Sequence, residues 1–96
     1  MSLPVWFRAA GETLWHNGVT QSVSTDGAVI RADSPAPSSE PVIVVIVLPS
    51  VAGCLVGRGR VVRTVEPCAQ RAAATFAIAV RRYRIRSKAV LSRLGL

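Results

Sequence analysis

The sequence is poor in the residues that build catalytic and metal centres. It has a single histidine, His16, and two cysteines, Cys54 and Cys68, without the C-x-x-C spacing of a zinc site. Its five acidic residues form no carboxylate pair at useful spacing, and no Ser/His/Asp set or glycine-rich phosphate loop stands out. These absences predict a protein that is not an enzyme and has no cofactor. Two cysteines without such spacing are typical of buried thiols in a reducing cytoplasm, and a disulfide between Cys54 and Cys68 is the alternative.

The sequence also lacks a segment suited to crossing a membrane. The uncharged stretch at residues 41–57 is interrupted by Pro49, Ser50 and Gly53, and it is shorter than the roughly 20 residues that a spanning helix needs. The first residues, MSLPVWFRAAGE, do not have the charged region, apolar run and cleavage site of a signal peptide. We therefore expect a cytoplasmic protein without a transmembrane segment.

The sequence is rich in valine, isoleucine and alanine, and half of its residues are hydrophobic. β-Branched residues favour strands, and short apolar runs separated by turn residues predict an all-β barrel or sandwich. Gly18 predicts a hairpin or bulge within the second run, and Gly27 predicts a turn with positive φ. A short helix is expected from Ser87 as N-cap. The expected strands are residues 4–8, 14–23, 28–32, 42–48, 55–65 and 73–80.

The run at residues 42–48, VIVVIVL, is apolar at every position. Such a run predicts a strand that is covered on both faces. A barrel at residues 1–86 would cover one face. The other would be covered by the helix at residues 87–96, packed on the barrel, or by a partner, including a second copy in a homodimer.

Positive charge is concentrated toward the C-terminus. The formal net charge is +7, no acidic residue follows Glu66, and seven of the twelve basic residues lie in residues 71–93. This asymmetry favours an anionic partner surface, although solvation of a small hydrophobic domain explains it equally well. The candidate partner-binding residues are Arg82, Arg84, Arg86 and Lys88.

Three segments, in order, resemble the PilZ domain family. Residues 22–27, SVSTDG, correspond to the family motif Asp/Asn-x-Ser-x-x-Gly, residues 59–63, GRVVR, resemble its penultimate strand, and residues 79–85, AVRRYRI, resemble its closing strand. The resemblance covers residues 4–85. It implies a six-stranded antiparallel β-barrel that binds cyclic di-GMP, a bacterial second messenger.

The resemblance also implies where the nucleotide would bind. Ser22, Ser24 and Gly27 carry the turn motif, while Arg8 and Arg31 are the candidate phosphate contacts. Ser22 replaces the family's Asp or Asn, and the family's R-x-x-x-R motif is absent because Glu12 follows Arg8 four residues later. Ser24 and Gly27 are also ordinary turn residues, and strand arginines are commonly exposed. Nucleotide binding is therefore expected to be weak or lost.

Three functional hypotheses follow from these observations. The first is a PilZ-like adaptor that acts through protein contacts, for instance in motility, pilus or polysaccharide machinery. The second is a functional cyclic di-GMP receptor with a divergent site. The third is a small basic nucleic-acid-binding protein, which the charge favours but which lacks interleaved exposed aromatic residues.

Overall fold

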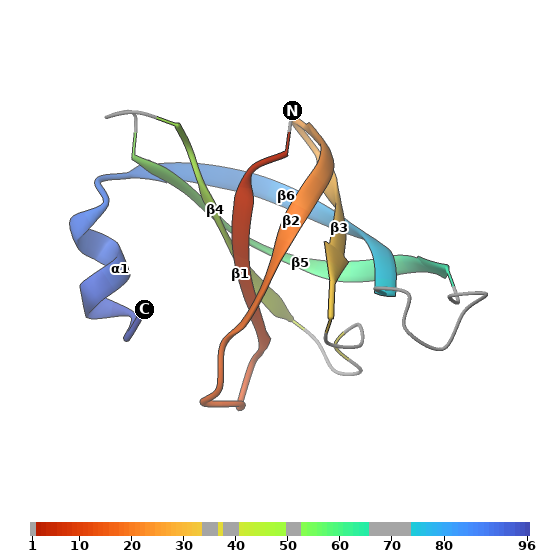
Figure 1. Cartoon of the computed structure of the whole chain (residues 1–96), viewed down its shortest axis with the longest axis horizontal. Coiled ribbons are helices and arrows are strands. Elements are labelled where there is room, and N and C mark those ends of the chain that lie inside the picture. The colour runs from red at the N-terminus through yellow and green to blue at the C-terminus, as the bar shows by residue number, and fades with distance from the viewer. Residues whose placement is uncertain (1, 34–36, 38–40, 50–52, 66–73) are drawn as a thin grey trace.

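The computed structural model describes residues 2–33, 37, 41–49, 53–65 and 74–96. Cys68 and most of the loop expected at residues 33–41 lie outside the described residues. Six antiparallel strands close into a barrel in the order β1-β2-β3-β6-β5-β4, and a short helix follows β6 (Figure 1). The all-β barrel prediction is confirmed. The elements are β1 (Pro4–Ala9), β2 (His16–Ser24), β3 (Gly27–Ala32), β4 (Val42–Val47), β5 (Cys54–Val65), β6 (Ala74–Arg86) and α1 (Ala89–Arg93).

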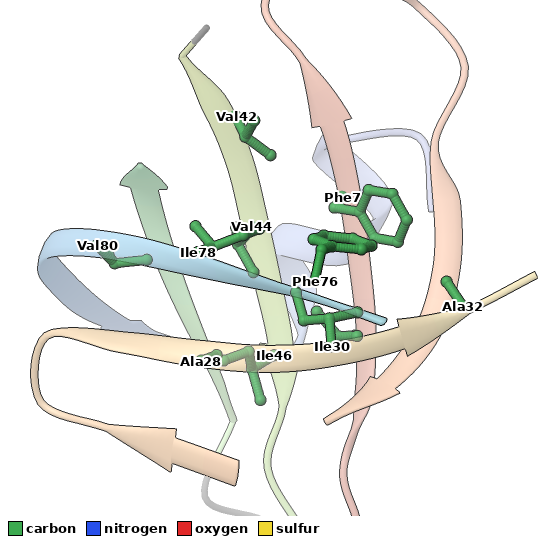
Figure 2. Close-up of a cluster of buried hydrophobic side chains, with 11 residues drawn as sticks. Phe7, Ala28, Ile30, Ala32, Val42, Val44, Ile46, Phe76, Ile78 and Val80 are labelled. Atoms are coloured by element: carbon green, nitrogen blue, oxygen red, sulfur yellow. The ribbon is translucent and has the colours of Figure 1, made fainter. Parts of the chain in front are cut away.

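Alternation along the strands fills the barrel interior with apolar side chains. Every second residue of β1, β3, β4 and β6 points inward, as the pleat requires, and these residues form one core cluster (Figure 2). At its centre Phe7 and Phe76 pack edge to face, with ring centroids 5.2 Å apart. The cluster contains Val5, Phe7, Ala28, Ile30, Ala32, Val42, Val44, Ile46, Phe76, Ile78 and Val80.

Strand β4 is buried on its inner face and buried or half-buried on its outer face, in keeping with its unbroken apolar run. Val44 and Ile46 belong to the interior cluster. Val45 alternates with them and therefore points away from the interior, yet its side chain is 0 % exposed. Cys54 of β5 is equally buried, and its Sγ lies against the carbonyl oxygens of Arg86 and Ser87. The chain that leads into α1 thus covers part of the barrel's outer face.

Helix α1 begins later than the sequence suggests. The N-cap is Lys88 rather than Ser87, and it makes no side-chain capping hydrogen bond, so the expected Ser87 cap is wrong. The end of the helix is tied to the barrel instead, because the Trp15 indole Nε1 donates a hydrogen bond of 2.9 Å to the Leu94 carbonyl oxygen. A helix this short is marginal by itself, so this long-range contact contributes to holding it in place.

Strands β5 and β6 form a long ribbon that changes neighbours along its length. Residues 54–59 of β5 pair with β4, whereas residues 74–79 of β6 pair with β3. These two stretches lie at opposite ends and on opposite edges of the ribbon. The ribbon therefore stops pairing with β4 at about the position where it starts pairing with β3. We call this position the barrel corner. Gly59 and Val80 face each other at that corner.

Strand β2 is irregular at a different place from the one predicted. Gly18 pairs regularly with Val5 and Ala32, and the register shifts instead between Thr20 and Ser22. Glycine is required at residue 18 because a Cβ there would lie 2.6 Å from the Arg31 carbonyl oxygen. The sequence signal was therefore a close approach of two strands rather than an interruption.

Candidate functional site

The turn that carries the expected nucleotide motif is a tight hairpin between β2 and β3. Ser24 Oγ donates a hydrogen bond of 2.8 Å to Asp26 Oδ1, and the Asp26 carbonyl oxygen accepts one of 2.9 Å from the backbone N–H of Val80. Ser22 and Ser24 are exposed. The hairpin is thus anchored to the middle of β6 and offers a serine hydroxyl and a carboxylate to solvent.

Gly27 has a different role from the one expected. It is not among the described glycines with positive φ, which are Gly11, Gly53 and Gly95, so that prediction is wrong. A Cβ at residue 27 would instead overlap the carbonyl oxygen of Ile78 on β6. Glycine therefore lets β3 approach β6 closely at the base of the hairpin.

Arg8 lies far from this hairpin and is engaged elsewhere. It lies near the end of β1 that faces the start of β2, whereas Ser24 ends β2. At about 3.3 Å per strand residue, the two sites are at opposite ends of the barrel (Figure 1). Arg8 Nη1 donates a hydrogen bond of 2.8 Å to the Glu12 carbonyl oxygen, and its guanidinium lies 4.9 Å from the Trp15 ring centroid. Arg8 therefore braces the loop between β1 and β2.

Arg31 occupies a third location. It is exposed on β3, where it pairs with Val19 and Thr75, and it lines a shallow pocket with residues of β2. The hairpin, Arg8 and Arg31 are thus three separate places on the barrel surface. The structure does not bring the predicted nucleotide contacts together.

A groove at the barrel corner brings other arginines together. Its volume is about 990 Å³, and its lining includes Arg58, Arg60, Arg81 and the hairpin residue Asp26. The register step from Gly57–Tyr83 to Gly59–Val80 leaves Arg58 opposite both Arg81 and Arg82, which is a β-bulge. We call this groove the arginine groove, after Arg58, Arg60 and Arg81 in its lining.

The arginine groove has the chemistry of an anion site. Guanidinium groups offer paired donors that match phosphate and carboxylate oxygens. Like charges across a strand pair destabilise the sheet, and Asp26 is the one acidic residue among the described residues that line the groove. Arg58 and Arg60 are two residues apart on β5, so strand alternation alone places them on one face. The position of Arg81 could not be predicted from the sequence, because the bulge depends on the pairing of two distant strands.

Tyr83 is a buried polar group beside the hairpin. Its hydroxyl is buried and has no hydrogen-bond partner among the described residues. Burial raises the pKa of Tyr83 above its ordinary value near 10, and the negative charge of Asp26 raises that pKa further. Burial also raises the pKa of Cys54, against a smaller opposing effect of Lys88.

These pKa shifts predict a loss of stability at alkaline pH. The folded state holds the Tyr83 proton more tightly than the unfolded chain does, so its contribution is complete below pH 10 and is lost as pH rises through the folded pKa. Replacing Tyr83 with phenylalanine removes that part of the loss. It also removes an unpartnered buried hydroxyl, so we expect the free energy of unfolding at pH 7 to rise by about 1 kcal/mol.

Urea unfolding of wild type and the Tyr83→Phe variant at pH 7 and pH 10.5 measures both effects. Cys54 is unchanged in the variant, so the variant retains the alkaline loss of stability that the thiol causes. A variant that is less stable than wild type at pH 7 would show that the hydroxyl has a stabilising partner.

The candidate partner-binding residues lie together at the end of β6. Arg82, Arg84 and Arg86 are exposed and make no ion pair within the described residues, and exposed Lys88 follows at the start of α1. The described contact between a carboxylate and a basic side chain is elsewhere, where His16 Nε2 lies 3.7 Å from Glu12 Oε2. The C-terminal half of β6 thus presents a basic surface on which Arg82, Arg84 and Arg86 have no carboxylate in ion-pair contact among the described residues.

The described part of the chain contains no group of three or more residues placed to hold a metal ion. None of its helices is long and apolar enough to span a membrane. No family model, curated protein or solved structure matches the chain.

Proposed function

We propose that this protein is a PilZ-like, non-enzymatic signalling adaptor that binds a protein partner through its basic C-terminal surface and binds cyclic di-GMP weakly or not at all. The closed six-stranded antiparallel barrel is the fold that the PilZ resemblance implies. The observation that carries the proposal is the separation of Arg8 from the Ser24–Gly27 hairpin, because it leaves the family's turn motif without its arginine clamp.

The missing clamp has a large expected effect on nucleotide affinity. Hydrogen bonds to charged groups contribute about 1.5–3 kcal/mol each. Two absent arginine clamps then cost about 3–6 kcal/mol, which corresponds to a loss of about 10²- to 10⁴-fold in affinity. A monomer with this hairpin alone is therefore a poor receptor.

The basic surface supports action through a partner. Arg82, Arg84 and Arg86 are exposed and unpaired among the described residues, and long-range attraction by such clusters speeds association with anionic surfaces. A component of motility, pilus or polysaccharide machinery is the partner that the PilZ resemblance suggests, with the complex forming in the cytoplasm.

The arginine groove favours a second candidate, a cyclic di-GMP receptor with a divergent site. Arg58, Arg60 and Arg81 lie beside hairpin residue Asp26 in one groove. They would supply phosphate contacts in place of the missing motif. This candidate places the ligand over β5 and β6.

Isothermal titration with cyclic di-GMP at low salt separates the two candidates. We expect no binding heat at micromolar ligand, because the hairpin lacks its clamp. A sub-micromolar isotherm would contradict the adaptor proposal. In that case Arg58→Ala and Arg81→Ala test the arginine groove and Ser24→Ala tests the hairpin, while Arg8→Ala serves as the control at the opposite end of the barrel.

A further inference from the structure

The C-terminal half of β6 has an unpaired strand edge. Residues 74–79 of β6 pair with β3 on one side and with β5 on the other. Residues 83–86 pair with β5 alone, because β3 begins at Gly27 opposite Ala79. Every second backbone N–H and C=O of this half therefore points away from β5. On that side the described residues provide no backbone hydrogen-bond partner for residues 83–86. Such an edge is a template for an additional strand.

The charges on this edge decide what can add to it. If the same edge of a second copy paired here, Arg82, Arg84 and Arg86 would lie opposite the arginines of that copy. Like charges directly opposite each other are destabilising. A segment with carboxylates at the facing positions would be attracted instead. The arginines thus discourage self-association and favour an acidic partner strand.

The two faces of the edge specify the pattern of that partner. Arg84 pairs with outward-facing Val56, so the arginines at residues 84 and 86 lie on the outer face. Tyr83 and Ile85 lie on the opposite face, and Ile85 is a large apolar side chain that is 70 % exposed. A strand added here would present acidic side chains beside the arginines and apolar side chains beside Ile85.

We propose that residues 81–86 of β6 bind an extended segment of a partner protein, about six residues long with alternating acidic and apolar side chains, as an added antiparallel strand. This inference rests on the proposed adaptor function and names the kind of partner and its binding mode. The backbone supplies hydrogen bonds, and the arginines and Ile85 supply specificity.

A capped synthetic peptide of alternating glutamate and valine, six residues long, is a direct probe. We expect it to bind at low salt, to weaken as salt rises, and to slow amide hydrogen exchange at alternate residues of 81–86. A peptide of the same composition with three glutamates followed by three valines should bind at least about tenfold more weakly, because it cannot match both faces at once.

Backbone methylation distinguishes strand addition from charge attraction. Two versions of the alternating peptide are compared, one N-methylated at its glutamates and the other at its valines. The N–H groups of these two sets point to opposite edges of the strand, so only the version whose methylated edge faces β6 should lose binding. Equal binding of both versions would overturn the proposal, and so would equal binding of the block peptide.

Matched variants locate the site on the protein. Arg84→Glu combined with Arg86→Glu should weaken peptide binding by about tenfold or more, whereas the control pair Arg31→Glu and Arg63→Glu, which are exposed elsewhere on the barrel, should change it less than threefold. Equal loss in both pairs would also overturn the proposal. Tight cyclic di-GMP binding would overturn the proposed function while leaving the peptide result intact, so the two failures are distinguishable.

Discussion

Replacing Gly59 with alanine is expected to lower the free energy of unfolding by about 3 kcal/mol or more, which is a large part of the 5–15 kcal/mol typical of a domain. The added Cβ would overlap the carbonyl oxygen of Ala79 on β6. That atom belongs to the backbone, so no side-chain rotation relieves the overlap. Gly59 also lies where the β5–β6 ribbon leaves β4 and joins β3, so separating the strands would open the barrel corner.

Gly11→Ala is the matched control for Gly59→Ala. Gly11 has φ of +91° in the loop after β1, and a Cβ there meets nothing within 4 Å. Its replacement costs only the strain of a left-handed residue, on the order of 1 kcal/mol. Urea unfolding at pH 7 compares the two variants, and equal midpoints would show that the strands can separate at Gly59 without loss.

The strand content of this fold was predictable because it depends on local patterns. Phe76, Ile78 and Val80 alternate along the expected strand at residues 73–80 and lie in the core, and the unbroken run in β4 predicted that both faces would be covered, as buried Val45 confirms. β6 extends past these residues to Arg86. The apolar pattern predicted this strand only as far as residue 80, because exposed arginines do not alternate with buried residues once the strand leaves β3, whereas the PilZ resemblance implied a closing strand at residues 79–85.

The roles of the glycines were not predictable from local patterns. Gly18 and Gly27 were assigned to an interruption and to a positive-φ turn, and both assignments are wrong. Each glycine instead makes room for a carbonyl oxygen of a neighbouring strand, at Arg31 and at Ile78 respectively. Which strand lies across from a glycine depends on pairing between distant segments, and a single sequence does not contain that information.

Some features of the candidate sites were likewise predictable from local sequence, and others were not. The β2–β3 hairpin was predictable, because Ser24 and Asp26 are turn residues and the structure joins their side chains by a hydrogen bond. The engagement of Arg8 with Trp15 was not predictable, nor was the convergence of Arg81 with Arg58 across the bulge. Both depend on where distant segments meet in the closed barrel.

Replacing Phe76 with alanine is expected to lower the free energy of unfolding by about 3–5 kcal/mol. Phe76 is 1 % exposed and packs edge to face on Phe7 at the centre of the core (Figure 2). A barrel of 96 residues has one small interior, so no neighbouring cluster compensates for the cavity. We expect the urea unfolding midpoint of the Phe76→Ala variant, followed by the near-ultraviolet circular dichroism signal, to fall well below that of wild type.

Two further measurements test the reason for this effect. Leu14→Ala is the control, because Leu14 is 68 % exposed and its truncation should cost less than about 0.5 kcal/mol. A double-mutant cycle of Phe7→Leu and Phe76→Leu, which leaves smaller cavities, should give a coupling energy of about 0.5–1.5 kcal/mol from the aromatic pair. If Phe76→Ala unfolded at the same urea concentration as Leu14→Ala, residue 76 would not lie in the core. Zero coupling in the cycle would instead mean that the two rings do not touch, because the transfer of each ring from water is already counted in the single variants.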